Sequence, residues 1–316
     1  METGTAAATL ASSADPHVFL IGRPPVTEFL QFVQTQTVEG QTTAVRALAD
    51  EWRAANDRIH ALEKSEAGIA DSPEVEALSP ELKTVGDAFL ADPLVERSYP
   101  LGNVSVGMVH LDNVVVFQKF VNLAYAQQLG DYLGSEPEPE TVFDFCLPRE
   151  RRYDPPVTKG QTAQGGFVFN SPSTDFRILG VKALEPDQVL GLDVSGVPAT
   201  VVAVAVGYGS NYLMTLRVGG RLVLWNGSHR AYALRANGIA RVPCVIQDVS
   251  RRDELEAHGG PDHPLNTHTD LFLTHPRPPL LKDYFDEQLH TIVHVPRRYR
   301  QVQLGFNGGQ ADLPAA

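Results

Sequence analysis

The sequence predicts an α/β (α+β) protein in which a helical N-terminal region precedes a domain built around a mixed β-sheet. Two observations predict this class. Before residue 134, apolar residues recur at helical steps of three and four, whereas short runs rich in β-branched residues replace that spacing beyond residue 140. With 316 residues the chain is long enough for about two domains, and its 43% hydrophobic content excludes global disorder.

The N-terminal region contains one long amphipathic pattern between Gln41 and Glu66. Its apolar residues form a single narrow seam: Val45, Leu48, Trp52, Ala55, Ile59 and Leu62. Such a seam requires a partner helix. One candidate follows Ser79-Pro80, a typical helix start, and the other runs from Asp112 to Leu133, with Gly134 at its end. The alternative is that the seam packs against a second copy of the chain, which gives a homo-oligomer through the N-terminal helices.

The acidic, proline-containing segment 135–140 has the composition of a linker and predicts a domain boundary. Beyond it lie six β-rich runs, at Gly166 to Asn170, Ile178 to Ala183, Thr200 to Val206, Tyr212 to Val218, Arg221 to Trp225 and Val242 to Gln247. Gly219-Gly220 provides the positive φ angles of a tight hairpin. The predicted divisions are a disordered tail over 1–16, a mainly helical region over 17–134, a linker with edge strands over 135–176, a mixed-sheet domain over 177–250 and a C-terminal extension over 251–316.

Charge and cysteine content restrict the partners. The net charge of -12 argues against general DNA binding, because that affinity comes from neutralising phosphates. Cys146 and Cys244 form no CxxC pair, which fits a reduced, cytoplasmic protein. No segment approaches the ~20 apolar residues of a membrane span, so no membrane contact is expected.

Two further patterns leave alternatives open. Arg23-Pro24-Pro25 is echoed by Arg277-Pro278-Pro279, through chance or similar packing, or as a duplicated binding element. Six histidines gather near the C-terminus: His258, His263, His268, His275, His290 and His294. Their spacing matches no zinc signature, so no metal ligand is assigned, and the segment is open between a histidine-rich loop and a transition-metal site.

The strongest local feature is the turn Asn226-Gly227-Ser228-His229-Arg230 between a predicted strand and a predicted helix. The first amides of a helix lack intrahelical partners and the helix dipole is positive there, which favours an anion by about half a kcal/mol or more. Gly227 permits close backbone approach, Ser228 can donate its hydroxyl, and Arg230 can bind phosphate oxygens. His229 can donate a hydrogen bond or carry a proton. The alternative is an ordinary turn with a serine cap.

The elements around the turn follow in a fixed order: Gly227 to Ala233, then Gly238, then Val242-Pro243-Cys244-Val245. This order resembles the ParB/sulfiredoxin-like superfamily, whose members share a strand, a Gly-x-x-Arg-x-x-Ala turn and helix, a glycine and a Val-Pro-x-Val strand. Val181 to Pro186 looks like the strand and turn that open such domains, so the resemblance covers about residues 177–250. It implies ATP or CTP as ligand, with Mg²⁺, and phosphates held by residues 226–230.

Departures from the family narrow what the resemblance implies. Ser228 stands where sulfiredoxins carry a reactive cysteine, so sulfinic acid reduction is not expected. No helix pair follows Ser250 of the kind that ParB proteins use to bind DNA. ParB-like serine kinases carry a catalytic glutamate where this chain has Gln188, and a neutral amide cannot act as a general base. DGQHR-type domains, associated with DNA modification systems, are relatives by motif alone, with Asn226 in place of aspartate.

We therefore expect a nucleotide-binding protein that hydrolyses a nucleotide or transfers its phosphoryl group to a small-molecule acceptor. Glu185, Asp187 and His229 are the catalytic candidates. The alternative is a non-catalytic protein that senses a nucleotide or another anion and assembles through its helices, which the amide at Gln188 favours. Turnover, the nucleotide and the acceptor stay open at this point.

Overall fold

The computed structural model describes residues 14–23, 25–99, 103–150, 156–173, 175–191, 193–309 and 311. It contains helices and mixed sheets, which confirms the predicted α+β class. Residues 1–13 of the predicted disordered tail lie outside the described residues, but the last three residues of that tail begin strand β1 (Ala14–Leu20). No helix in the described part of the chain is long and apolar enough to cross a membrane.

The chain divides into two compact units whose bounds differ from the divisions expected from composition. Unit 1 consists of Met1–Glu150 with Asn211–Pro296, and unit 2 of Arg151–Ser210 with Arg297–Ala316. The expected 177–250 domain is shared between both units. The expected boundary at 135–140 lies inside unit 1, where Pro139 begins helix α7 (Pro139–Cys146). The proline that suggests a linker is therefore a first-turn residue, a position where its missing N–H is harmless.

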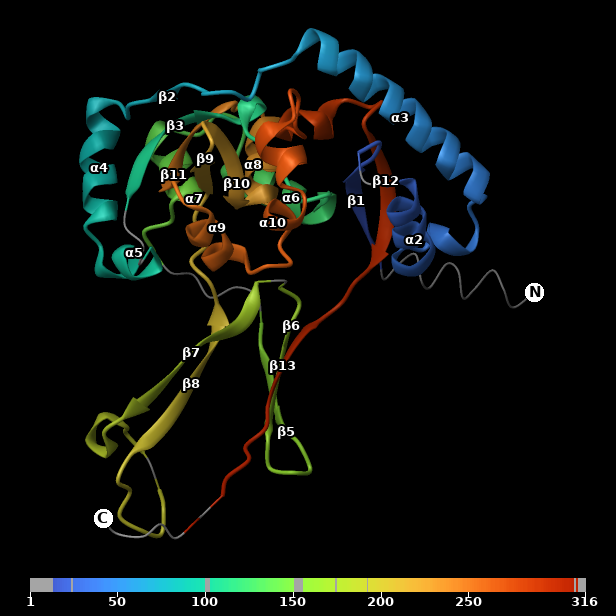
Figure 1. Ribbon diagram of the computed structural model, residues 1–316. Helices are drawn as coiled ribbons and strands as arrows, with labels where there is room; N and C mark the ends of the chain where they lie inside the picture. The colour runs from blue at the N-terminus through green and yellow to red at the C-terminus, as the bar shows by residue number, and fades with distance from the viewer. Residues whose placement is uncertain are drawn as a thin grey trace. The chain divides into compact units, whose positions relative to one another are not determined.

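Unit 1 is built on a five-stranded sheet with the order β10-β9-β11-β3-β2 (Figure 1). Its strands are β2 (Val75–Glu76), β3 (Val104–His110), β9 (Met214–Val218), β10 (Arg221–Asn226) and β11 (Arg241–Val249). Gly219 and Gly220 turn the β9–β10 hairpin at φ +58° and +80°, as predicted. Helix α8 (Ser228–Ala236) then leads to β11, which runs parallel to β9.

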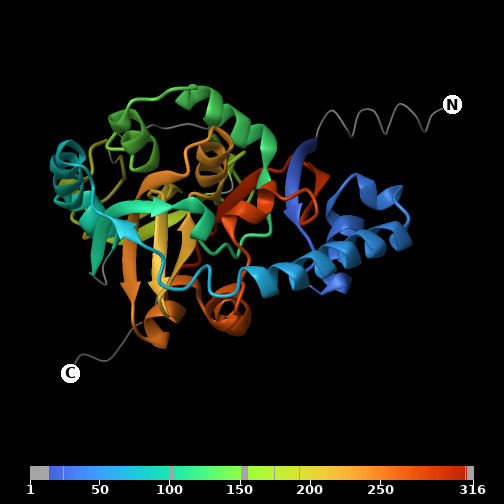
Figure 2. The same cartoon turned by 90° about the horizontal axis from the view of Figure 1, so that it is seen from above.

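A second, antiparallel sheet of unit 1 has the order β12-β1-β4. Its other strands are β4 (Phe120–Asn122) and β12 (His290–Pro296). Helices α2 (Val26–Gln36) and α3 (Val45–Ser65) cover this sheet (Figure 2). The seam residues Leu48 and Ala55 of α3 join one core cluster with Phe29 and Val293. The seam is thus buried by α2 and this small sheet, so both expected partner helices are wrong.

The predicted helix over 112–133 is wrong in its first half. A 3₁₀ turn (Leu111–Asn113), an extended segment and β4 come first, and helix α6 spans only Leu123–Leu133. The extended segment contains Val115, which forms β-bridges with Val223 of β10 and with Leu280. Three consecutive β-branched valines favour this extended backbone over a helix.

At the two ends of α6, the predicted start is wrong and the predicted end is confirmed. Its N-cap is Asn122, whose side chain accepts a hydrogen bond from the Tyr125 N–H at 3.0 Å, so the predicted cap at Asp112 is wrong. Gly134 ends the helix at φ +80°, as predicted. The remaining helical elements are α4 (Pro80–Leu90), α5 (Pro93–Ser98), α9 (Arg252–Gly259), α10 (Pro264–Thr267), 3₁₀ turns at Glu39–Gln41 and Leu281–Phe285, and a π-helical turn at Asp270–Thr274.

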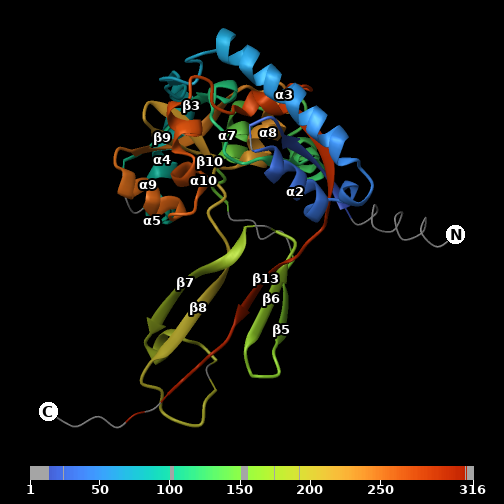
Figure 3. The same ribbon diagram turned by 45° about the vertical axis from the view of Figure 1, so that its right-hand side comes forward.

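Unit 2 holds a three-stranded sheet and a two-stranded ribbon. The sheet has the order β13-β6-β5 and contains β5 (Thr158–Gln161), β6 (Phe167–Ser171) and β13 (Arg300–Leu304). The ribbon pairs β7 (Phe176–Leu184) with β8 (Val201–Tyr208) along their length (Figure 3). The β-rich runs predicted for this part of the chain are confirmed as strands, but β7 does not join the sheet of β9 to β11.

A buried ionic cluster surrounds Arg277, whose side chain is 1% exposed. Its guanidinium donates to Asp283, at 2.6 Å for one of the two bonds, and to Glu66 at the end of α3, at 3.0 Å. Arg23 donates to the backbone carbonyl of Arg277, so the two Arg-Pro-Pro segments meet in unit 1, although Pro24 lies outside the described residues. These contacts favour similar packing as the explanation of the repeated Arg-Pro-Pro sequence.

Replacing Arg277 with methionine is expected to lower the free energy of unfolding by about 3–5 kcal/mol, because Asp283 would stay buried without its partner. Urea denaturation followed by circular dichroism measures this change. Arg46→Met is the control, since its pair with Asp50 is 94% and 58% exposed and contributes little. A loss for Arg277→Met no larger than that for Arg46→Met would contradict a stabilising role of the cluster.

Candidate functional site

The turn at residues 226–230 has the strand–turn–helix geometry that the sequence predicts. Gly227 takes the left-handed conformation at φ +91°, and a Cβ atom at this position would lie 2.8 Å from Leu213 Cδ1. Only glycine fits both demands. The first hydrogen bond that closes α8 runs from the Ala231 N–H to the Gly227 carbonyl at 2.8 Å. The amides of residues 228–230 precede it, at the positive end of the helix dipole.

The Ser228 side chain faces the extended segment that precedes β4. Its hydroxyl donates to Gln118 Oε1 at 2.6 Å. Gln118 is itself held in place, since the Tyr284 hydroxyl donates to its backbone carbonyl. A neutral hydroxyl–amide pair of this kind can exchange partners with a ligand oxygen, because both groups donate and accept.

His229 is a neutral hydrogen-bond acceptor in this structure. Its Nε2 accepts from the backbone N–H of Asn122 at 3.1 Å, which assigns the ring proton to Nδ1. Burial, and to a smaller extent the nearby His17, lowers the pKa of His229 to about 4. The Asn122 side chain also donates to Asp15 at 3.2 Å. Asp15, Asn122 and His229 therefore form a connected polar chain between β1 and the start of α8.

Arg230 is directed into the protein. Only 8% of the residue is exposed, and its guanidinium donates to the backbone carbonyls of Cys146 and Asn211. It also lies 5.9 Å from the ring centre of Phe145. These contacts tie the end of α7 and the start of the 211–218 segment to α8. A phosphate could use this guanidinium only by competing with those carbonyls.

The other two catalytic candidates, Glu185 and Asp187, belong to unit 2. They flank Pro186 in a 3₁₀ turn (Pro186–Gln188), and both are exposed. Gln188 uses its side-chain oxygen to accept from the Glu185 N–H at 2.9 Å, so it stabilises this turn. The structure thus assigns the five turn residues to unit 1 and the two acids to unit 2.

Sequence reasoning missed four polar residues that the fold brings to the turn: Asp15, His17, Gln118 and Asn122. Asn122 precedes a helical pattern as a cap residue, and that signal was available in the sequence. Gln118 carries no comparable local signal, because Gln118 and Lys119 are simply two neighbouring polar residues within an apolar run. Its role depends on the tertiary placement of its segment.

Three of the C-terminal histidines make hydrogen bonds, ring contacts or ion pairs within the fold. His258 hydrogen-bonds to Gln247 Oε1 at 2.9 Å, and the His263 ring lies 4.7 Å from that of Trp225. His294 pairs with Glu39 at 2.6 Å within the β12 region. Among the described residues, no group of three or more His, Cys, Asp or Glu side chains is arranged to hold a metal ion.

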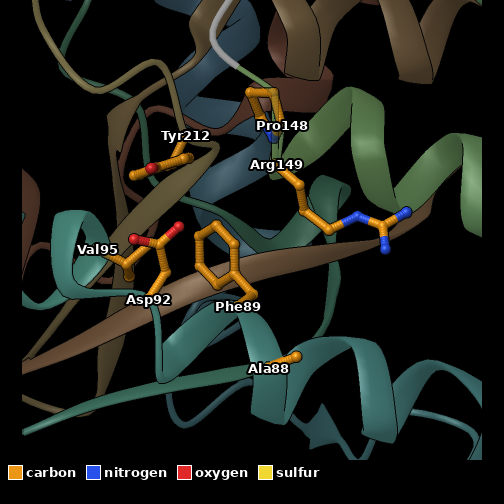
Figure 4. A pocket seen from close by; sticks show the side chains of 7 residues that line it. All are labelled: Ala88, Phe89, Asp92, Val95, Pro148, Arg149 and Tyr212. Atoms are coloured by element: carbon orange, nitrogen blue, oxygen red, sulfur yellow. The ribbon is translucent and has the colours of Figure 1, made fainter.

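A small hollow of about 140 Å³ lies elsewhere in unit 1, beside Phe89 and Tyr212 (Figure 4). Its polar groups are already used. Asp92 accepts from the Leu94 N–H at 2.7 Å as the cap of α5, and Arg149 pairs with Asp144 at 2.6 Å. The Arg149 guanidinium points away from Tyr212 in Figure 4. The charged side chains of this hollow are therefore engaged in other contacts. The turn at residues 226–230 is the candidate site.

Comparisons with known proteins do not assign the chain. A scan against models of protein families finds no match, and searches of curated proteins and of solved structures find none. The resemblance to the ParB/sulfiredoxin-like superfamily stays a prediction from the sequence.

The low pKa of His229 predicts a loss of stability as pH falls. The unfolded chain takes up the proton near 6.5 and the folded protein near 4, so the stabilisation is complete above pH 6.5 and disappears towards pH 4. Each unit of pKa shift is worth 1.36 kcal/mol, so His229 accounts for roughly 3 kcal/mol of the decrease in the free energy of unfolding. Urea titrations of wild type and His229→Gln across this range measure it, because glutamine keeps an acceptor without titrating.

His60→Gln, at an exposed histidine, controls for the substitution itself. The difference in free energy of unfolding between wild type and His229→Gln should change as the pH falls from 6.5 to 4. Parallel pH profiles for wild type and His229→Gln would contradict burial of a neutral His229.

Proposed function

We propose that unit 1 binds a nucleotide, ATP or CTP, with its phosphates at the start of α8. The observation that carries the proposal is the conformation of Gly227, which only glycine can adopt against Leu213 and which starts α8 so that the amides of residues 228–230 have no partner within the helix. Backbone amides at a helix start recognise phosphate without a charged side chain. Mg²⁺ would accompany the nucleotide, and no residue is assigned to it.

The side chains of the turn divide into two roles under this proposal. The Ser228 hydroxyl and the Gln118 amide supply neutral donors to phosphate oxygens, and Asn226 supports the turn by accepting from the Gly227 N–H at 2.8 Å. Arg230 acts as a positioning residue, since its guanidinium already serves two carbonyls. His229 stays uncharged near neutral pH, so it adds no charge to the phosphate site.

Nucleotide binding without turnover fits these contacts best. Phosphoryl transfer requires positioned cations and a base at the terminal phosphate. The arginine of the turn is engaged inside the protein by two backbone carbonyls, so it does not supply a cation to the terminal phosphate. We therefore propose a nucleotide-responsive binding protein, and phosphoryl transfer or hydrolysis as the second candidate.

One observation favours the second candidate. Asp15 is an acid of unit 1 connected to the turn, through Asn122 and then His229. Asn122 donates both of these hydrogen bonds, so they hold Asp15 near the turn and do not relay a proton to it. As a base, Asp15 would accept the proton of a nucleophile directly. Asp15 thus joins Glu185 and Asp187 as a candidate base.

Ser228→Ala is expected to weaken ATP or CTP binding by about ten- to a hundredfold, because one hydrogen bond to a charged phosphate is worth about 1.5–3 kcal/mol. Isothermal titration calorimetry with each nucleotide and Mg²⁺ measures the change. Ser79→Ala is the matched control, since Ser79 caps α4 by accepting from the Leu82 N–H at 3.4 Å. Absence of binding by the wild-type chain, or equal weakening by both variants, would remove the proposal.

Asp15→Asn separates binding from turnover. If the second candidate holds, this isosteric change leaves the dissociation constant within a small factor and abolishes phosphate release from ATP or CTP. A malachite green assay of released phosphate measures it, with Asp187→Asn as the companion variant from unit 2. Release that survives Asp15→Asn and is lost in Asp187→Asn would assign the base to unit 2; no release by wild type supports the non-catalytic protein.

A further inference from the structure

The β7–β8 ribbon of unit 2 exposes many large apolar side chains. Val181 of β7 is 65% exposed and Val202 of β8 is 63% exposed. Further exposed apolar residues of the ribbon and its connecting loop are Ile178, Leu179, Leu190, Val194 and Val197. Contiguous exposed apolar surface of this kind marks an interaction site.

The sequence of β8 is that of a strand buried on both faces. It reads Val-Val-Ala-Val-Ala-Val from residue 201 to 206, without polar alternation. Such continuous runs are typical of strands inside a covered sheet. In the described structure, however, β8 hydrogen-bonds only to β7. An isolated two-stranded ribbon is marginally stable in water, so this strand requires a further partner.

The two free edges of the ribbon differ in a way that indicates where the partner adds. β7 carries Arg177 and Lys182, and its register shifts between Ile178 and Gly180, which marks a bulge. Charged residues, lysine above all, and bulges are the features by which proteins block pairing at a sheet edge. β8 has no charged residue, no proline and no register shift of its own. Its edge is left open to pairing, whereas that of β7 is blocked.

We propose that the β8 edge pairs with β8 of a second copy of this chain, antiparallel, to give a four-stranded sheet with the order β7-β8-β8-β7. A second copy suits this edge because two identical uncharged strands meet without opposing like charges. A nucleic acid or a charged peptide would find no charge on β8 to recognise. The blocked β7 edges end the sheet on both sides, so the assembly closes as a two-fold dimer.

This interface differs from the one that the sequence suggests. Most of the seam of α3 is buried within unit 1, where Leu48 and Ala55 join the core cluster of α2 and the β1–β12 sheet, and only Val45 at its start is largely exposed among the described seam residues. The dimer rests on unit 2 and is independent of nucleotide binding at the turn.

A lysine on each strand tests the proposal, because Val202 and Val181 are almost equally exposed. Val202→Lys places a charge in the new sheet and is expected to raise the dimer dissociation constant by about tenfold or more, equivalent to 1.4 kcal/mol. Val181→Lys is the matched control, and it should remain dimeric like the wild type. Light scattering coupled to size-exclusion chromatography over a dilution series measures both, with circular dichroism to verify folding.

A cysteine scan over residues 202–206 tests the pairing directly. Opposed residues of an antiparallel pair point to the same face, so a two-fold axis makes one residue of β8 face its own copy, with Cα atoms about 4.5–5.5 Å apart. That spacing suits a disulfide. Cys146 and Cys244 are 0% and 1% exposed, so the introduced thiol is the reactive one. One position should cross-link efficiently under mild oxidation, and Val181→Cys should not.

A monomeric wild type at high micromolar concentration would overturn the proposal. Equal behaviour of Val202→Lys and Val181→Lys, or cross-linking through Val181→Cys as readily as through β8, would overturn it as well. Association that grows with concentration without a plateau at two copies would show open-ended pairing, and it would contradict a closed dimer.

Discussion

The backbone hydrogen bonds of the extended segment 114–119 are the constraint on which unit 1 depends. The Val115 N–H donates to the Leu222 carbonyl, and the Val115 carbonyl accepts from the Leu224 N–H, both at 2.8 Å. On its other side the segment bonds to Pro279 and Leu281, each at 3.0 Å. Because a buried backbone group without a partner costs about 1–3 kcal/mol, moving this segment would break several bonds at once. One short stretch therefore fixes β10 and the C-terminal part of unit 1 to each other.

The same segment determines the composition of the candidate site. It presents Gln118 to Ser228 and leads directly into β4, whose Asn122 reaches His229; both partners lie more than a hundred positions away in the chain. The turn contributes the backbone conformation, and the segment contributes the neighbouring polar groups. The candidate site needs both the turn and this segment, so the local motif alone does not define it.

Buried arginines serve the framework of unit 1. Arg277 gathers Asp283 and Glu66, and Arg230 holds the carbonyls of Cys146 and Asn211. The planar guanidinium suits this use, because its five donors can satisfy several acceptors in one plane. At the turn this has a functional consequence. Under the proposed function, a phosphate at the turn would rely on backbone amides and neutral side chains, an arrangement suited to binding a nucleotide more than to stabilising a transferred phosphoryl group.

The sequence by itself determined the local elements of this protein. The glycine hairpin at 219–220, the serine cap of α4 and the glycine-led start of α8 follow from backbone preferences of a few neighbouring residues, and the structure confirms all three. Only the tertiary structure decided which strands pair. Valines 114–116 fit a helical spacing as well as a strand, and β7 could have joined β11 or β8, because a strand's partner depends on distant backbone groups that local spacing does not encode. The direction of Arg230 was likewise decided by the carbonyls that folding places around it.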